Sequence, residues 1–342
     1  MQKSILIIYT GGTIGMITEP DKNSLTPFNF KEIRRHVPEI EKYGHRLEAV
    51  TIYPVVDSSN IKPESWIKIA ELIRDEYDHY DGFIVLHGTD TMSFSASALS
   101  FMLENLGKPV IFTGSQLPVS SLRTDARENL IAAIEIAAAE KEGFPLIPEV
   151  CIYFEFKLFR GNRTTKYSSE DFNAFISPNF PALAESGVRL KYHPELILSI
   201  DRDLKLKIHT RLDNNISILK IFPGISENVL DAILGTTGLK AVILETFGAG
   251  NAPTDPWFFE KISAANKAGI LFLNITQCTQ GSVEMGRYET SEHLINAGVI
   301  SGFDSTPEAA ITKLMFLLGQ ELSTPEIKLL LNKPIKGEIT IY

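Results

Sequence analysis

Short polar motifs rich in threonine follow apolar runs at several points of this 342-residue chain. The first is YTGGTIGM at 9–16, where residues 4–9 have the continuous apolar pattern of a strand buried on both faces. Glycines directly after such a strand allow a tight turn or a close approach of the backbone to another group. Thr13 therefore lies either in a strand-to-helix turn or at the tip of a ligand-binding loop.

A second motif, LHGTDTM at 86–92, places Thr89 and Asp90 after another apolar strand and before a helix. In open α/β sheets, ligands bind in the crevice outside the carboxyl ends of the strands. Thr89, Asp90 or Thr91 could instead cap the following helix, where threonine and aspartate are preferred. Capping alone does not explain why two strands both carry threonine and glycine at their carboxyl ends, on the same side of the sheet. The recurrence of this pattern favours a ligand-binding site.

A third polar cluster, DSSN, brings Asp57, Ser58 and Ser59 to another strand end. Such residues often form turns because their side chains bond to nearby backbone groups. The functional alternative is a polar cradle for a small zwitterionic ligand. The neighbouring motifs are what favour this second interpretation.

The motif RGNRTTK at 160–166 concentrates positive charge near a further strand end. A run of this kind is commonly a solvated face. Lys166, if carried to the edge that holds Thr89 and Asp90, could instead pair with Asp90 and lower the effective pKa of a hydroxyl.

These residue types fit acyl transfer by hydroxyl groups, without a metal or cofactor. Threonine is a poor nucleophile at its ordinary pKa and needs a base or an electropositive neighbour, which an Asp–Lys pair and a second threonine would supply. Glycine-rich backbone around Thr13 could present N–H groups to a developing oxyanion. The histidines show no metal-ligand spacing, and neither a phosphate loop nor a nucleophile elbow occurs. We expect His87 to be packed and hydrogen-bonded, and Cys278 to be a small buried hydrophobe.

The elements that must position these residues alternate between strand-like and helix-like runs. Strands are predicted at 47–57, 81–87, 108–114 and 149–159, and helices at 64–80, 91–107 and 126–140. This alternation predicts a mostly parallel sheet with helices on both faces.

The alternation lapses between about 160 and 215 and then resumes, with a well-capped helix at 305–320. We therefore predict two α/β domains, the larger N-terminal one carrying the threonine motifs. The expected ranges are 1–190 for this domain, 191–212 for a linker region and 213–342 for a smaller C-terminal α/β domain.

Composition excludes several classes of function. The formal net charge of −9 argues against a nucleic-acid or anionic-membrane partner. Apolar runs are too short for a transmembrane helix, and the first residues fit a strand better than a signal peptide. Two cysteines are too few for a disulfide framework, which indicates a reducing compartment, so we expect the protein to be cytoplasmic.

At these residues the sequence resembles the L-asparaginase family, specifically its cytoplasmic bacterial type I branch. The motifs YTGGTIGM, DSSN, LHGTDTM, RGNRTTK, GNAP and TQC occur in the family's order, together with the long run ASALSFMLENLGKPVIFTGSQLP. The resemblance extends over nearly the whole chain. It implies hydrolysis of L-asparagine to L-aspartate and ammonia, and assembly as a homodimer or homotetramer with active sites close to a subunit interface.

The resemblance also implies roles for individual residues. Thr13 would attack the side-chain carboxamide carbon, and a second set would relay protons, namely Thr89, Asp90 and Lys166. The substrate's α-amino and α-carboxylate groups would be held by Asp57, Ser58 and Ser59, with Thr89 and Asp90 also at the substrate.

The sequence departs from the family pattern at two places. The family's mobile loop carries a tyrosine that helps to activate the nucleophile, but the corresponding position here falls on Ser24 or Leu25. Relatives with an allosteric asparagine site carry an arginine where this chain has Glu245. A carboxylate there repels a ligand carboxylate, so we expect this regulation to be absent or altered.

Two alternatives remain. The chain could be a catalytically weak or idle sensor that binds asparagine or aspartate in the same pocket, since the loop tyrosine is missing. It could also be the amidase subunit of a tRNA-dependent amidotransferase, but that subunit carries an extra N-terminal domain, whereas the first motif here begins within a dozen residues of Met1.

Overall fold

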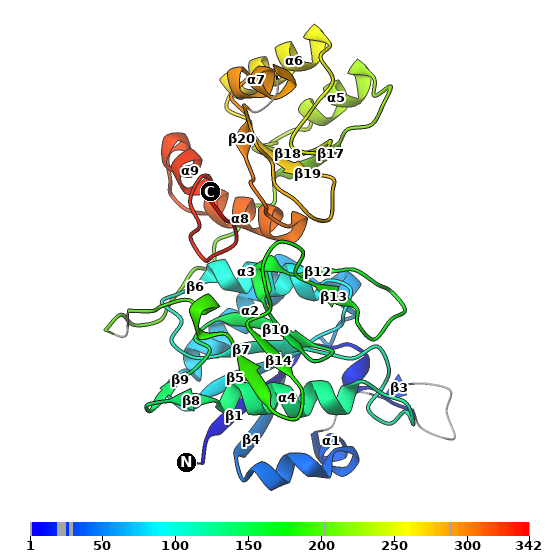
Figure 1. Cartoon of the computed structure of the whole chain (residues 1–342), viewed down its shortest axis with the longest axis vertical. Helices are drawn as coiled ribbons and strands as arrows, with labels where there is room; N and C mark the ends of the chain where they lie inside the picture. The colour runs from blue at the N-terminus through cyan, green and yellow to red at the C-terminus, as the bar shows by residue number, and fades with distance from the viewer. Residues whose placement is uncertain (1, 19–24, 27–29, 202, 287–288, 342) are drawn as a thin grey trace. The chain divides into compact units, whose positions relative to one another are not determined.

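The computed structural model describes residues 2–18, 25–26, 30–201, 203–286 and 289–341. The chain forms two compact units that divide between Thr210 and Arg211, and each is built on its own parallel or mostly parallel sheet (Figure 1). The prediction of two α/β domains, with the larger one N-terminal, is confirmed.

The first unit contains an eight-stranded sheet in the order β15-β14-β11-β10-β7-β5-β1-β4. Its parallel strands are β1 (Ser4–Tyr9), β4 (Arg46–Thr51), β5 (Gly82–Leu86), β7 (Val110–Thr113) and β10 (Val150–Phe154). An antiparallel edge follows, made of β11 (Lys157–Arg160), β14 (Ala184–Ser186) and β15 (Leu190–Tyr192). The sheet is thus mostly parallel, as the sequence predicts.

Helices cover both faces of this sheet (Figure 1). One face packs against α4 (Ala126–Ala138) and α1 (Phe30–His36), and the other against α2 (Pro63–Asp75) and α3 (Met92–Met102). Every residue of β5 is buried, which is why the central strands are apolar throughout instead of alternating. Both α2 and α3 end about five residues before their predicted ends.

Among its described residues, the first unit also contains four pairs of two-residue strands outside the main sheet. They are β2 (Ile17–Thr18) with β3 (Leu25–Thr26), β6 (Leu103–Glu104) with β16 (Lys207–Ile208), β8 (Glu140–Lys141) with β9 (Phe144–Pro145), and β12 (Thr165–Lys166) with β13 (Phe175–Ile176).

The prediction of one strand over 149–159 is wrong. The chain reverses at Glu155 and Phe156, which both have positive φ, and β10 pairs with β11 as an antiparallel hairpin. The sequence conceals this turn because neither residue is one that usually adopts a left-handed conformation.

The second unit has a four-stranded parallel sheet, β17-β18-β19-β20. Its strands are β17 (Ile216–Lys220), β18 (Ala241–Thr246), β19 (Leu271–Thr276) and β20 (Ile300–Ser301). One face packs against α5 (Glu227–Leu234), α6 (Pro256–Lys267) and α7 (Glu289–Asn296), and the other against α8 (Pro307–Gly319) and α9 (Thr324–Leu331). The predicted cap of α8 is confirmed, because the Thr306 hydroxyl accepts the Ala309 N–H at 3.2 Å.

Candidate active site

The carboxyl ends of neighbouring parallel strands carry the polar motifs. β1 leads to Thr13, β4 to Asp57, and β5 to Thr89 and Asp90, while β1 lies between β4 and β5 in the sheet. The chain crosses from one side of β1 to the other between β4 and β5, so the strand order reverses there. In open α/β sheets this switch point is where the ligand crevice forms.

Glycines bring the loops after β1, β4 and β5 into direct backbone contact. A Cβ on Gly11 would lie 2.0 Å from the Val56 carbonyl oxygen, and one on Gly12 would lie 2.5 Å from the Gly88 nitrogen. Both glycines also have positive φ. The TGGT motif therefore allows this loop to lie against its two neighbours, an approach that any side chain would prevent.

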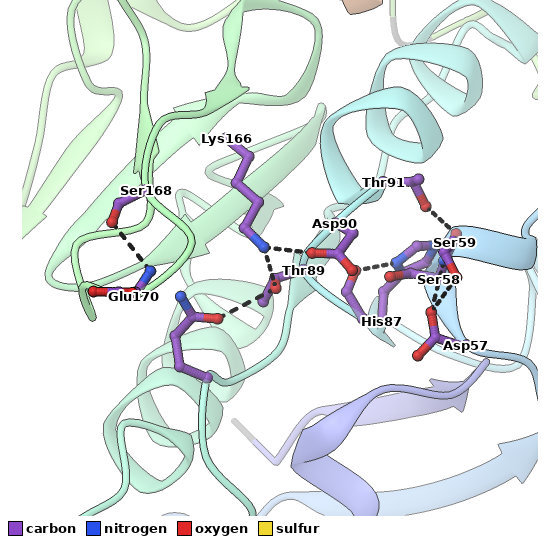
Figure 2. Close-up of polar contacts among 12 residues, drawn as sticks. Asp57, Ser58, Ser59, His87, Thr89, Asp90, Thr91, Lys166, Ser168 and Glu170 are labelled. Atoms are coloured by element: carbon purple, nitrogen blue, oxygen red, sulfur yellow. Dashed lines mark hydrogen bonds and ion pairs between the residues drawn. The ribbon is translucent and has the colours of Figure 1, made fainter.

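Lys166 joins the two polar residues that follow β5. Its Nζ lies 2.9 Å from Thr89 Oγ1 and 2.5 Å from Asp90 Oδ1 (Figure 2). The Lys166 side chain is 17% exposed and that of Asp90 is 61% exposed, so the ammonium is largely shielded while the carboxylate is open to solvent and ligands. Of the two interpretations of this lysine, the structure has the pairing with Asp90.

Lys166 reaches this edge by a route that the sequence does not predict. Because β11 runs back along the sheet, the chain leaves it at Arg160 and returns along α3, where the Ser97 hydroxyl contacts the Gly161 carbonyl at 3.4 Å. A Cβ on Gly161 would lie 3.0 Å from the Ala96 side chain. Small residues at this contact let the segment run close to α3 and deliver β12 beside Thr89.

The side chains after β5 do not cap α3. Thr91 is the residue at the N-cap position, but it makes no capping hydrogen bond and its hydroxyl donates to the Ser58 carbonyl at 2.6 Å. Thr89 and Asp90 are engaged by Lys166 instead. The hydrogen bond of the Thr91 hydroxyl to Ser58 thereby joins the loops after β4 and β5 directly (Figure 2).

Asp57 and Ser59 form a local turn. The Asp57 carboxylate accepts the Ser59 amide at 2.8 Å and the Ser59 hydroxyl at 2.7 Å. These donors, the hydroxyl first, lower the pKa of Asp57, while Ser58 is buried. The turn interpretation thus describes the local structure, and the exposed carboxylate of Asp57 remains a candidate ligand for an ammonium group.

Thr13 begins a short 3-10 turn at the tip of the β1 loop, with the buried Ile14 anchoring it. Its hydroxyl has no hydrogen-bond partner among the residues that the structure describes. The structure therefore brings Thr13 close to the Thr89 loop through Gly12 and Gly88, but joins it to Lys166 by no direct contact.

Gln116 is a site residue that the sequence reasoning missed. It follows β7, the strand next to β5, and its Oε1 accepts the Thr89 hydroxyl at 3.3 Å. Its backbone N–H donates to the Asp125 carboxylate at 2.9 Å, which fixes the backbone of the loop. The rule that singled out the other loops, polar residues at the carboxyl end of a buried strand, applies to this one too.

Of the predictions for other residues, the one for His87 is confirmed and the one for Cys278 is wrong. His87 is buried and hydrogen-bonded as predicted. The prediction for Cys278 is wrong, because this thiol is exposed in the loop after β19. Ser24, one of the two positions expected to replace the family's loop tyrosine, lies outside the described residues, and the side chain of Leu25 is not described either. Glu245 pairs with Lys220 at 3.2 Å.

Comparison with known proteins gives matches over both units. The family description "Asparaginase, N-terminal" matches residues 4–198, and "Glutaminase/Asparaginase C-terminal domain" matches residues 215–331. The L-asparaginase 1 of Escherichia coli K12 is 44% identical over 345 residues, covering 99% of this chain and 98% of that protein. The 60 kDa lysophospholipase of Mus musculus is 39% identical, covering 99% of this chain and 63% of that protein.

Among solved structures, L-asparaginase I from Vibrio cholerae superimposes with a TM-score of 0.91 and 41% identity, covering all of both chains. Fold and site thus define a two-domain α/β protein of the asparaginase and glutaminase class. The chain belongs to the L-asparaginase family, as its motifs predict, and its relatives include type I members.

Proposed function

We propose that this protein hydrolyses L-asparagine to L-aspartate and ammonia. The observation that carries the proposal is the contact of Lys166 Nζ with both Thr89 Oγ1 and Asp90 Oδ1 beside the loop of Thr13. Binding alone needs no second hydroxyl held against a lysine and a carboxylate. Family membership and the 44% identity to a protein named L-asparaginase 1 support the substrate.

In this proposal Thr13 is the nucleophile. Its Oγ1 forms a bond to the carboxamide carbon while its proton passes to the Thr89 oxygen. The Thr89 proton passes to Lys166 Nζ as the Lys166 ammonium gives one of its own protons to the Asp90 carboxylate, so the proton is held at Asp90 until the relay runs in reverse. The tetrahedral intermediate collapses as the C–N bond breaks, and the same relay returns a proton to the departing ammonia. Water then cleaves the acyl-threonine ester, which releases L-aspartate and restores the Thr13 hydroxyl.

The polar residues around the relay hold the substrate. Asp57 and Asp90 are exposed carboxylates that attract the α-ammonium group. Ser58, Ser59 and Thr89 provide hydroxyl and backbone groups for the α-carboxylate. Orientation by these groups converts attack by Thr13 into an effectively unimolecular step.

Assembly and compartment form a separate part of the proposal. We infer a homodimer or homotetramer from the family resemblance, and a cytoplasmic protein from two cysteines that both carry free thiols. Within the described ranges, every helix is too short or too polar to cross a membrane. Light scattering after size-exclusion chromatography measures the oligomeric state. A monomer at micromolar concentration would contradict the proposed homodimer or homotetramer.

The test is ammonia release from L-asparagine and L-glutamine by the purified protein and by a Thr13→Ala variant. A lysophosphatidylcholine is included because one relative is named a lysophospholipase. We expect ammonia from L-asparagine, and a loss of at least about 1,000-fold in kcat for the variant, since nucleophilic catalysis is removed.

Other outcomes decide against the proposal in distinguishable ways. Binding of L-asparagine by calorimetry without ammonia release would identify a sensor that has kept the pocket. Fatty-acid release without ammonia would identify a lipid substrate. Ammonia release that persists in the Thr13→Ala variant would move the nucleophile to another residue.

A further inference from the structure

Both threonines of the site are preceded by a glycine whose carbonyl accepts a hydrogen bond from a buried aromatic side chain. The Tyr9 hydroxyl donates to the Gly12 carbonyl at 3.2 Å, and the His87 ring contacts the Gly88 carbonyl through Nδ1 at 2.7 Å. The two arrangements are independent in sequence but equivalent in form. Neither aromatic residue has a place in the relay or the substrate cradle described above.

Tyr9 supports the first loop from the face of the sheet covered by α4. It is 1% exposed and belongs to the same apolar cluster as Ile14 and Leu86. Burial raises the pKa of Tyr9 to about 12, so its hydroxyl keeps its proton and remains a donor.

His87 supports the second loop from the opposite face. A carbonyl only accepts, so Nδ1 carries the proton and donates to Gly88, and Nε2 then accepts the Ser95 hydroxyl at 2.9 Å. Ser95 in turn accepts the Trp66 indole N–H at 2.8 Å. Complete burial lowers the pKa of His87 to about 4, so the ring stays neutral and the direction of this chain is fixed.

Each bond fixes the direction of an amide. In a trans peptide the C=O and N–H groups point to opposite sides, so holding the Gly12 carbonyl inward turns the Thr13 N–H outward, and Gly88 does the same for Thr89. Within the part of the chain that the structure describes, neither threonine amide donates a hydrogen bond. The two peptides are neighbours, since a Cβ on Gly12 would lie 2.6 Å from the Gly88 Cα.

We propose that Tyr9 and His87 are positioning residues that hold the Thr13 and Thr89 amides toward the reacting carboxamide oxygen as a two-donor oxyanion hole. The inference rests on the proposed amide hydrolysis. The amides stabilise charge that exists only in the transition state, and fixed dipoles serve this purpose because they need no reorganisation. Loss of one support frees a peptide to rotate and weakens transition-state binding without removing a group that touches the substrate.

The test compares isosteric variants in ammonia release from L-asparagine. Tyr9→Phe removes one hydroxyl, and Tyr153→Phe is its matched control, because Tyr153 is equally buried but bonds to Glu128 at 3.4 Å. We expect Tyr9→Phe to lower kcat about tenfold with KM within about twofold, a smaller effect than deleting an oxyanion donor, which costs about 100- to 1,000-fold. Tyr153→Phe keeps the wild-type kcat.

A second pair tests His87. His87→Asn keeps a donor near the position of Nδ1, whereas the similarly shaped His87→Leu has none, and both lose the contact with Ser95. We expect kcat to be about tenfold higher in the Asn variant than in the Leu variant, with equal Kd for L-aspartate measured by calorimetry.

Three results would overturn the inference. Equal kcat for the Tyr9 and Tyr153 variants, or for the two His87 variants, refutes positioning while the proposed hydrolysis stands. A change confined to KM would show a role in ground-state binding only. Absence of ammonia release by the wild-type protein removes the proposed function, and the positioning roles with it.

Discussion

Gly12 is where the structure makes its sharpest prediction about the geometry of the site. In a Gly12→Ala variant the new Cβ would lie 2.5 Å from the Gly88 nitrogen and 2.9 Å from the His87 carbonyl carbon. These atoms are all backbone, so no side chain can move aside. Ordinary contacts of a Cβ begin at 3.4 Å, so the loops of Thr13 and Thr89 must separate by about 0.9 Å, and a shift near 1 Å costs about 100-fold in rate.

The matched control is Gly44→Ala. Gly44 also has a positive φ, of 65°, but a Cβ there meets nothing within 4 Å. It therefore carries the cost of a left-handed residue, about 1–2 kcal/mol, without a clash. Gly12 has φ 90° and ψ 167°, a conformation that side chains avoid more strongly than the left-handed one of Gly44, so a larger loss of stability in Gly12→Ala combines backbone strain with the contact between the loops. The comparison of kcat is therefore the one that reports on the contact between the loops.

The assay combines ammonia release with urea unfolding. We expect Gly44→Ala to keep kcat within about twofold of the wild type, and Gly12→Ala to lower it about 100-fold and to lower the free energy of unfolding by more than the control does. A folded Gly12→Ala protein whose kcat equals that of Gly44→Ala would refute the reasoning, because the loops would then not depend on this contact.

Three further predictions concern other parts of the chain. Arg160→Met should lower the free energy of unfolding in urea by about 3–5 kcal/mol, because it leaves the buried carboxylate of Glu149 without its guanidinium partner at 2.7 Å; a loss below about 1 kcal/mol contradicts this. The initial rate against L-asparagine concentration should be hyperbolic, since the family resemblance implies that Glu245, which pairs with Lys220, stands where allosteric relatives carry an arginine; a sigmoidal curve counts against this prediction. Ser59→Ala should raise the pKa of Asp57 part of the way to its ordinary value, because it removes the hydroxyl hydrogen bond that favours the ionised form and keeps the bond from the backbone N–H. Carboxyl NMR titration measures this shift, and an unchanged titration would show that the Ser59 hydroxyl does not bond to Asp57 in solution.

The direction of the Asp57 shift also sets its contribution to pH-dependent stability. A carboxyl whose pKa is lowered on folding stabilises the native state above its unfolded pKa, near 4. This contribution is lost as the pH falls through the folded pKa. It is expected to be small, because the carboxylate is exposed.

Sequence by itself determined the elements that depend on local pattern. The runs that become β1, β5 and β7 are continuously apolar because they are covered on both faces, and their ends are marked by glycine and threonine. The positions of Thr13, Thr89 and Asp90 at one sheet edge follow from parallel pairing alone. Family motifs reinforced these placements.

Other features of the site depend on the tertiary structure, because they involve contacts between segments that are distant in the sequence. The chain reverses at Glu155 and Phe156, which are not typical turn residues, so the sequence does not predict that the segment before Lys166 runs along α3. The sequence does offer the pairing of Lys166 with Asp90 as one of two interpretations. The hydrogen bonds of Tyr9 and His87 to the glycine carbonyls depend on which face of the sheet each side chain occupies. Sequence specifies which residues are available to the site, but the directions of peptides and the contacts between loops are set only when distant segments pack together, because close packing leaves each backbone group a single position.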